Sequence, residues 1–408
     1  MNIGLLTMAT QLNYGATLQA MALREILSEL APFDHVETVN YDMTTNGEEL
    51  YGDPLVRLLA VWKIPVLKRL AVRILCPLRM HAHKIRRTRT QRFLRDRVQI
   101  GHIVFHEPTD LWRNNPYDLF VVGSDQVWRY QGRAHKFCLL SGLASPSVSR
   151  ISYAASLGWD SLPKAFHGEF ITALEKFDAI SVREPSAVGV LKGLLGEKRD
   201  ISYVVDPTIL YGRARWQRFL EDNPVSIGSE NYAFVYWLNE VDRIFPVLKG
   251  LKNNGFERVK VVLPWYMRLL GGDILALKKV FRRMVRDFGA DICVAAGPIE
   301  FVHLLANARF VVSNSFHALM FSLLFDRPAK IFVEIENAVD PMAPRMLSFA
   351  ERHGLEDVVF RGLENNCDFP ILSGHDYGGV WESVERDRQI SLAWLKNSLA
   401  RCGVRTKS

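Results

Sequence analysis

The chain's 408 residues are 48% hydrophobic and 23% charged, which excludes a disordered or fibrous protein and accommodates about two domains. Its formal charge of +7 is concentrated in residues 57–97, which hold 13 Lys and Arg against one acid, Asp96, a net charge of +12. The other residues carry 38 basic and 43 acidic side chains, a net of −5, so attraction to an anionic partner is expected only from this basic segment.

A membrane-spanning or secreted protein is not expected. No stretch approaches the ~20 uncharged apolar residues of a spanning helix, and the richest apolar stretch, residues 55–78, contains five Lys and Arg. The apolar residues before the first polar loop are too few for a secretory signal. The five cysteines are widely spaced, and we therefore predict a cytoplasmic protein.

Strand-like and helix-like stretches alternate along the chain, which predicts parallel sheets covered by helices. In the first half we expect strands at 3–7, 119–122, 151–155, 179–182 and 203–205, and a helix at 15–30. Between them, residues 54–97 interleave apolar and basic side chains, and Pro54, Pro65 and Pro77 would divide this segment into short helices. In the second half the expected strands are 233–238, 259–263, 290–294, 310–312 and 330–333, with helices at 241–254, 269–288, 299–308 and 317–325. An amphipathic stretch at 381–400 is expected to form a last helix.

Turn-forming residues between 211 and 231 mark the expected domain boundary. The chain is thus divided into a first domain at 1–220 with a basic helical excursion at about 54–97, a second domain at 230–372, and a C-terminal helix at 375–403 that packs back. The basic excursion has two interpretations. It is either an interfacial helix that holds the protein at the inner face of the cell membrane, or a helix that packs on the first domain. Nucleic acid is not an expected partner because aromatic residues are few and no binding motif is present.

Polar residues stand where several expected strands end, which is where ligands bind in open α/β sheets. A polar loop at 11–15 contains Asn13 and lacks the GxGxxG pattern of dinucleotide sites. Ser124 and Asp125, then Arg183, follow later strands of the first half. In the second half Ser313, Asn314 and Ser315 lead into His317 and an apolar helix. Taken singly, Asp125 could form an Asx turn, Arg183 could pair with Glu184, and His317 could be a capping residue.

The sequence around these residues resembles the polysaccharide pyruvyl transferase family. The similar segments are 3–7, 13–20, 117–128, 151–158, 180–184, 204–208, 297–301 and 311–317, in the family's order. The chain departs from the pattern at Ala318, where many members have glycine, and at Ser315, where some have arginine.

The resemblance implies two Rossmann-like α/β domains that face each other across a cleft, similar to the GT-B arrangement, with a C-terminal helix. It also implies transfer of a pyruvyl group from phosphoenolpyruvate to a sugar of a surface polysaccharide or its lipid-linked precursor, which forms a pyruvate ketal. Phosphoenolpyruvate is a co-substrate in this chemistry, and no cofactor is expected.

Ketal formation needs a proton for the methylene carbon, a base for the sugar hydroxyl and cations for the anionic donor. By position in the family pattern, His317 would contact the donor and serve as the acid, and Asp125 would orient or deprotonate the hydroxyl. The other expected donor-binding residues are Arg183, Asn314, Ser315 and, more weakly, Arg345. Asn13 and Ser124 would hydrogen-bond donor or acceptor.

Of four further interpretations of the sequence, two remain open and two are disfavoured. A nucleotide-sugar glycosyltransferase could use the same scaffold, and a non-catalytic glycan-assembly protein would fit the departures at Ser315 and Ala318. A metal site is not expected, because His81 and His83 lie in the basic segment without a spaced Cys/His cluster. Nor is Ser124 part of a G-x-S-x-G elbow, so serine hydrolysis is not indicated.

Overall fold

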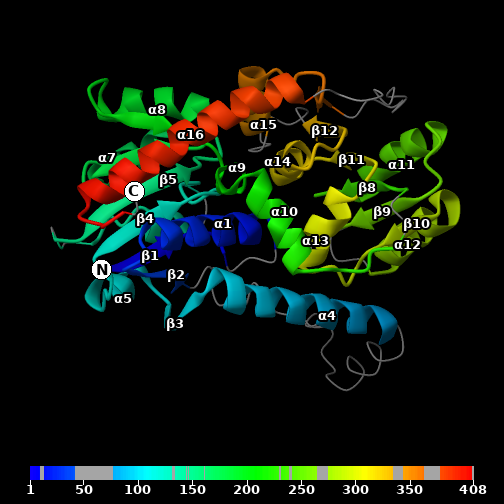
Figure 1. Ribbon diagram of the computed structural model, residues 1–408, viewed down its shortest axis with the longest axis horizontal. Helices are drawn as coiled ribbons and strands as arrows, with labels where there is room; N and C mark the ends of the chain where they lie inside the picture. The colour runs from blue at the N-terminus through cyan, green and yellow to red at the C-terminus, as the bar shows by residue number, and fades with distance from the viewer. Residues whose placement is uncertain are drawn as a thin grey trace.

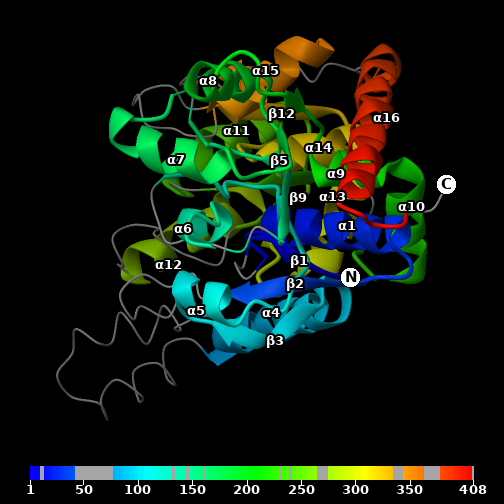
Figure 2. The same ribbon diagram turned by 90° about the vertical axis from the view of Figure 1, so that its left-hand side faces the viewer.

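A computed structural model describes residues 1–9, 13–41, 77–130, 134–143, 145, 147–159, 161–228, 231–238, 241–263, 274–333, 343–362 and 377–406. Within these residues the chain forms two parallel sheets, which lie side by side with helices on their faces (Figure 1). Both ends of the described chain lie at the first sheet (Figures 1 and 2). Among the described residues, no helix combines the length and the apolar character needed to span a membrane.

The first sheet has seven strands in the order β3-β2-β1-β4-β5-β6-β7. They are β1 (Asn2–Leu6), β2 (His35–Tyr41), β3 (Ile100–Phe105), β4 (Leu119–Gly123), β5 (Ser149–Ala155), β6 (Ala179–Val182) and β7 (Ile201–Tyr203). Its helices are α1 (Tyr14–Leu30), α4 (Pro77–Phe93), α5 (Pro108–Arg113), α6 (Ala134–Cys138), α7 (His167–Leu174), α8 (Pro185–Leu195), α9 (Pro207–Tyr211) and α10 (Arg213–Asp222). Since β1 pairs in parallel with both β2 and β4, the strand order reverses beside β1.

The second sheet has six strands in the order β10-β9-β8-β11-β12-β13. They are β8 (Ala233–Tyr236), β9 (Val259–Val262), β10 (Ala290–Ile292), β11 (Phe310–Ser313), β12 (Ala329–Val333) and β13 (Val359–Arg361). Its helices are α11 (Ile244–Asn253), α12 (Ile274–Phe288), α13 (Pro298–Ala306), α14 (Phe316–Leu324) and α15 (Ala343–His353). Here β8 lies between β9 and β11, so the order reverses between β8 and β11. This is the doubly wound, Rossmann-like topology.

Most expected strands are present, with three kinds of difference. The strand expected at 203–205 ends at Tyr203, so Val204 and Val205 belong to the loop that follows β7. Strands β2, β3 and β13 were not expected from the sequence. In β2, polar side chains alternate with apolar ones, so the sequence lacks the continuous apolar stretch of a buried strand. The helix expected at 241–254 begins as a 3₁₀ turn, Val241–Arg243, and Pro246 lies in the first turn of α11.

The two domains share one apolar core. Tyr14, at the start of α1, stacks on Phe301 of α13 with ring centres 4.6 Å apart, and its hydroxyl donates to the carbonyl of Ala296 at 2.7 Å. Tyr236 at the end of β8 meets both rings edge-on. Because aromatic side chains from both domains interlock here, the first turn of α1 is fixed against the second domain.

The described part of the basic excursion, α4, packs on the fold and reaches the second domain. Arg86 is buried, donates to the Leu263 carbonyl at 2.8 Å and covers the Tyr14 ring. Arg89 donates to the carbonyl of Ala295 and pairs with Glu300 at 3.1 Å. The helix begins at Pro77, where the sequence predicted a break. The rest of the segment, residues 54–76, lies outside the described residues.

A long C-terminal helix, α16 (Gly378–Arg401), crosses from α15 back over the first domain, on the side of the molecule away from α4 (Figure 1). Asp387 of α16 accepts from Arg352 of α15 at 2.8 Å and lies 3.6 Å from the His353 ring nitrogen Nε2. Ser391 of the same helix contacts the first domain. The expected C-terminal helix at 381–400 is therefore present and joins the two domains.

We predict an acid-dependent loss of stability from His353. Burial lowers the pKa of His353, Asp387 raises it and Arg352 lowers it, and the net result is a pKa of about 4. The unfolded chain binds this proton below pH 6.5 and the folded protein does not, so stability falls as the pH drops from 6.5 to about 4. At pH 5 the loss is about 2 kcal/mol. Urea unfolding at pH 7 and pH 5 measures it, and His353→Asn removes it whereas the exposed His35→Asn does not; an equal pH dependence in all three proteins contradicts the prediction.

Candidate active site

Side chains from both domains meet where the carboxyl ends of the two sheets face each other. Asp125 follows β4, Arg183 follows β6 and Asp206 follows β7 in the first sheet, and His317 follows β11 in the second. They make a connected cluster, with Arg183 and His317 both beside the carboxylate of Asp206. The sequence predicted three of these residues separately, and the structure brings them together around Asp206.

Asp206 is the N-cap of α9 and is fully buried. One carboxylate oxygen, Oδ1, accepts from the Thr208 backbone at 2.9 Å and from its hydroxyl at 2.7 Å. The other, Oδ2, accepts from Arg183 Nη1 at 2.8 Å and from the hydroxyl of Ser124 at 3.3 Å. His317 Nε2 lies 3.7 Å from Oδ2, within ion-pair range and beyond hydrogen-bond distance.

The surroundings of Asp206 keep it ionised. Burial alone would raise the pKa of this carboxyl, but His317 and Arg183 beside it and the Thr208 amide together hold the pKa far below its usual range. The stabilising contribution is therefore complete above the unfolded-state pKa of about 3.9 and is lost only as the pH falls through the lower folded-state value. At neutral pH the carboxylate of Asp206 is therefore a fixed negative charge beside the side chains of Arg183 and His317.

Arg183 is held in position from three sides. Its side chain is 1% exposed, and besides Asp206 it lies 3.7 Å from Asp125 and 3.5 Å from Glu184. The guanidinium also covers the ring of Phe316, the first residue of α14, at 4.6 Å. Burial lowers the pKa of Arg183, but the carboxylates of Asp206, Glu184 and Asp125 outweigh it and the net shift is upward. The guanidinium therefore stays charged, and it contacts the second domain.

His317 stands in the first turn of α14, whose N-cap is Ser315. Its ring lies against the backbone of Gly15 in α1, and a methyl group on Gly15 would sit 2.1 Å from Nδ1 of the imidazole. Two helix N-termini therefore meet at this histidine, that of α1 from the first domain and that of α14 from the second. The positive dipole ends of both helices favour an anion there.

Two donors in the cluster lack partners in the described structure. Nη2 of Arg183 and Nε2 of His317 are buried and form no hydrogen bond. Buried polar groups are rarely left unpaired because each costs free energy. An anion with several oxygens would supply both missing acceptors, and charge-assisted bonds of this type are the stronger ones.

The other sequence-predicted residues lie at different places. Asp125 adopts the left-handed backbone conformation with φ of 65°, which aspartate tolerates better than most residues, and its carboxylate points at Arg183. Ser124 holds Asp206, and Asn13 caps α1 through Gly15 N at 3.0 Å. Asp125 and Ser124 thus belong to the cluster, and Asn13 shapes the helix end that His317 contacts.

The predicted donor-binding residues near α14 differ in their surroundings. The Asn314 amide bonds both backbone groups of Leu238 at 2.7 Å, which ties the loop after β8 to α14. Ser315 is buried, and its N–H donates to the Ser313 hydroxyl at 3.1 Å. Arg345 is in α15, and its side chain lies outside the described residues.

Asp206 and Gly15 were not among the expected site residues, although both lie in segments of the chain that resemble the family. Asp206 comes directly after a buried strand and before Pro207, which is the pattern of a helix N-cap. Nothing in the sequence indicates that it faces His317, which is 111 positions away. Among the described residues, no group of three or more His, Cys, Asp and Glu side chains is arranged to hold a metal ion.

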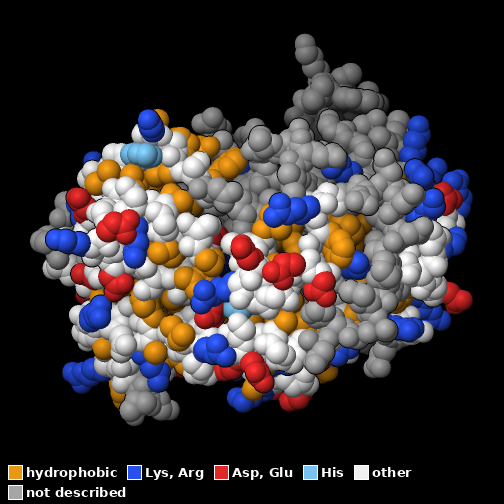
Figure 3. Space-filling view, turned by 90° about the horizontal axis from the view of Figure 1, so that it is seen from above, with side chains coloured by type: hydrophobic (Ala, Val, Ile, Leu, Met, Phe, Trp, Pro, Cys, Tyr) orange, Lys and Arg blue, Asp and Glu red, His pale blue; other side chains and the backbone are white. Residues whose placement is uncertain are grey.

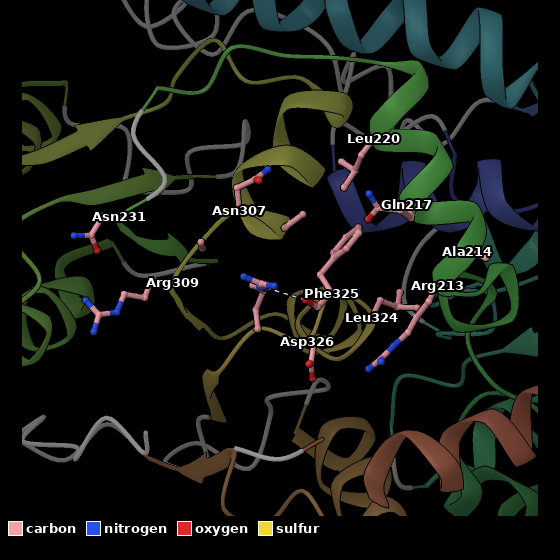
Figure 4. A pocket seen from close by; sticks show the side chains of 13 residues that line it. Arg213, Ala214, Gln217, Leu220, Asn231, Asn307, Arg309, Leu324, Phe325 and Asp326 are labelled. Atoms are coloured by element: carbon pink, nitrogen blue, oxygen red, sulfur yellow. Dashed lines mark hydrogen bonds between the residues drawn. The ribbon is translucent and has the colours of Figure 1, made fainter. Parts of the chain in front are cut away.

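A pocket of about 770 Å³ lies elsewhere, between α10 and the second domain (Figure 4). Asn231, Arg309 and Arg327 in its lining precede β8, β11 and β12, so it is at the amino ends of these strands. Arg213 and Arg309 lie at opposite sides of it and do not point to a common centre (Figure 4). The cluster around Asp206 is at the opposite, carboxyl ends, where ligands of α/β sheets bind.

We predict that Gly15→Ala lowers activity by displacing His317. The added methyl group cannot coexist with the observed imidazole position, so the ring must move. A shift of about 1 Å in a reacting group costs up to about 100-fold in rate. The matched control is Gly189→Ala in α8, where a methyl group meets nothing within 4 Å. Turnover at saturating substrate measures the effect, and equal rates for both variants would contradict the prediction.

Several solved structures are similar to this chain. A UDP-N-acetylglucosamine 2-epimerase from Rickettsia bellii is 12% identical with a TM-score of 0.53, and the alignment covers 99% of this chain and 97% of that one. A Methanocaldococcus jannaschii UDP-GlcNAc 2-epimerase is 12% identical with a TM-score of 0.48, and the alignment covers 96% of this chain and 93% of that one. A Thermobaculum terrenum O-GlcNAc transferase mutant is 13% identical with a TM-score of 0.41, and the alignment covers 99% of this chain and 67% of that one.

The likeness to the Rickettsia bellii protein shows the fold, and with the two parallel sheets it confirms the expected pair of Rossmann-like domains in a GT-B-like arrangement. No curated protein matches the chain in sequence. The sequence profile of one family, described as polysaccharide pyruvyl transferase, matches residues 13–331. That match includes Asp125, Arg183, Asp206 and His317 and extends over well more than half of the 408 residues, and so the chain belongs to the polysaccharide pyruvyl transferase family.

Proposed function

We propose that this protein transfers a pyruvyl group from phosphoenolpyruvate to a sugar residue of a surface polysaccharide or its lipid-linked precursor and forms a pyruvate ketal. One observation carries the proposal. Arg183 from the first domain and His317 from the second share Asp206, and each has a buried nitrogen without a hydrogen-bond partner. Phosphoenolpyruvate has a carboxylate and a phosphate, which supply acceptors of the kind that both donors lack.

The chemistry assigns a task to each side chain. A sugar hydroxyl adds to C2 of phosphoenolpyruvate while its own proton goes to a base and C3 receives a proton. A second hydroxyl of the sugar then displaces inorganic phosphate from C2 and closes the ketal, so that one phosphoenolpyruvate and one diol give one ketal and one phosphate. His317 delivers the proton to C3, and Asp125 takes the proton from the attacking hydroxyl. Arg183 holds the donor's anionic group in a planar fork.

Asp206 holds these groups in place. It is ionised and buried, and its Oδ2 lies 3.7 Å from His317 Nε2, so its negative charge faces the ring of the proposed general acid. The N-termini of α1 and α14 add N–H dipoles beside the donor. Ser124 holds Asp206, and Asn314 holds the loop after β8. Asn13 and Ser315 serve as hydrogen-bonding groups near the donor.

The proposal is tested by phosphate release from phosphoenolpyruvate in the presence of a bacterial glycan extract. We expect turnover that depends on the extract and a mass gain in the glycan equal to one ketal-linked pyruvate. UDP-sugars serve as the comparison donor, since the alternative glycosyltransferase function would release UDP and ignore phosphoenolpyruvate. The proposal is overturned if the protein neither binds phosphoenolpyruvate nor turns it over with any of several acceptors.

We also propose that the protein acts in the cytoplasm, on the inner membrane face where a lipid-linked acceptor would be presented. Support comes from α4 and the turn after it, which bury Arg86, Thr90 and Phe93 and expose Arg92 and Arg95 at 78% and 74% of their side chains. On the face that carries α16, by contrast, basic and acidic side chains of the described residues are interspersed (Figure 3). Basic residues near an anionic membrane contribute about 1 kcal/mol each.

Vesicle flotation tests the membrane contact. We expect wild-type protein to float with anionic vesicles at low salt and not with neutral ones, and Arg92→Glu with Arg95→Glu to weaken flotation. The matched control replaces Arg283 and Arg286 of α12, which are also exposed, by Glu. Absence of flotation at low salt, or equal loss in the control, would remove this part of the proposal.

A further inference from the structure

The residue before Asp206 is held by groups that lie outside the sheet. Just past the end of β7, the Val204 N–H still donates a hydrogen bond to the Val182 carbonyl of β6 at 3.0 Å. Val205 comes next, and its N–H donates to the Ser391 hydroxyl of α16 at 3.0 Å, across 186 positions of sequence. Its carbonyl accepts from the Tyr153 hydroxyl, also at 3.0 Å. Both backbone groups of Val205 therefore depend on side chains from other elements.

The helix that follows Asp206 is held by α16 as well. Arg388 Nη1 donates to the carbonyl of Leu210 in the last turn of α9 at 3.2 Å. Helix α9 has five residues, too few to be stable without such contacts. The two ends of the segment that bears Asp206, Val205 and Leu210, are thus both tied to one face of α16.

Ser391 is fixed within α16 and through it to the second domain. Its hydroxyl donates to the carbonyl of Asp387 one turn earlier at 2.7 Å, which aims the oxygen lone pairs at Val205. The side chain of Asp387 is bound by Arg352 and His353 of α15. Ser391 is 1% exposed, so water cannot replace it as the partner of Val205.

From these contacts we infer that Ser391 is a positioning residue that sets the distance between Asp206 and His317. It lies beyond residues 13–331, the part that the family profile matches. The 3.7 Å from His317 Nε2 to Asp206 Oδ2 is just beyond hydrogen-bond distance, so a small displacement of Asp206 makes or breaks this contact. Without the hydroxyl, the Val205 N–H is a buried donor without an acceptor, and the loop must move to find one. The inference rests on the proposed function for its kinetic readout.

The kinetic test compares Ser391→Ala with Ser391→Thr, which keeps a hydroxyl, and with Ser398→Ala, another buried serine of α16. We expect Ser391→Ala to lower kcat by about 10-fold to 100-fold, as for a reacting group displaced by up to 1 Å. KM for phosphoenolpyruvate should change less than kcat, because Arg183 is also held by Asp125, Glu184 and the ring of Phe316. Ser391→Thr should restore kcat and Ser398→Ala should leave it near wild type. An unchanged kcat in Ser391→Ala, or an equal loss in Ser398→Ala, would overturn the inference.

Two further measurements separate positioning from general destabilisation. If Ser391 acts through Asp206, adding Ser391→Ala to Asp206→Asn should lower kcat little beyond the single Asp206→Asn variant, whereas multiplying effects would overturn the inference. Amide hydrogen exchange at Val205 needs no activity. It should accelerate in Ser391→Ala and not in Ser398→Ala, and unchanged exchange would overturn the inference. If the variants show this difference in exchange but the wild-type protein releases no phosphate, only the proposed function is contradicted.

Discussion

His317→Gln is expected to lower phosphate release from phosphoenolpyruvate by about 10²-fold to 10⁴-fold, the range for removal of a general acid. Glutamine can place an amide N–H near the position of Nε2 but cannot deliver a proton, so the variant separates acid catalysis from hydrogen bonding. Folding should be retained, because Asp206 keeps its bonds to Arg183, Ser124 and Thr208. KM for phosphoenolpyruvate should rise much less than kcat falls.

The matched control is His303→Gln. His303 is likewise a buried histidine of the second domain, but its ring nitrogen contacts the Asn223 carbonyl at 2.6 Å, away from the cluster. We expect near wild-type turnover per folded molecule for this variant, with folding checked by thermal unfolding. If His317→Gln retains more than about a tenth of the wild-type rate, general acid catalysis by His317 is excluded.

Arg183→Lys is expected to lower kcat/KM for phosphoenolpyruvate by about 10²-fold to 10³-fold, as for loss of an oriented donor to developing charge. Lysine keeps the positive charge but cannot bond Asp206 and the donor's anion at once through a planar fork. Arg150→Lys is the matched control, since Arg150 is a buried arginine of the same domain that donates to the carbonyl of Leu143. Equal losses in the two variants would show that the effect is structural and not on the donor.

Arg183→Met should in addition destabilise the protein by about 3–5 kcal/mol, because it leaves the buried Asp206 charge without its nearest cation. The sign of the pH dependence follows from that charge. Arg183 lowers the pKa of Asp206, so its removal raises that pKa and lets the carboxyl take up a proton more readily. The difference in unfolding free energy between wild type and variant should therefore shrink as the pH falls towards about 4. A difference independent of pH in urea unfolding would contradict this account.

Much of the fold could be predicted because buried parallel strands have a plain sequence pattern. The runs at 119–122, 179–182 and 310–312 are apolar, short and followed by polar residues, and each is a strand. Strands β2, β3 and β13 escaped this reasoning. Each mixes polar with apolar side chains, and β3 and β13 lie at sheet edges where burial is incomplete. Sequence patterns indicate burial, so partly exposed strands give a weak signal.

The basic segment shows the limit of composition as a guide. Its +12 charge left open whether it meets a membrane or packs on the first domain, and two of its arginines, Arg86 and Arg89, bond carbonyls of the second domain, with Arg86 buried. In the same helix other arginines face solvent. Which charges are structural and which are free depends on the rotation of α4 against the fold, and that rotation is set by packing.

The sequence by itself indicated most of the buried strands, the starts of several helices and the polar residues between them, because periodicity and capping are local properties of the chain. It therefore indicated Asp125, Arg183 and His317, and it left open whether each was structural or functional. Only the tertiary structure showed that Asp206 lies between Arg183 and His317, that Gly15 makes room for the imidazole, and that Ser391 holds the loop before Asp206. Apart from the pair Arg183 and Asp206, which are 23 positions apart, these contacts join residues more than a hundred positions apart. They follow from how two sheets and α16 pack together, which no local pattern encodes.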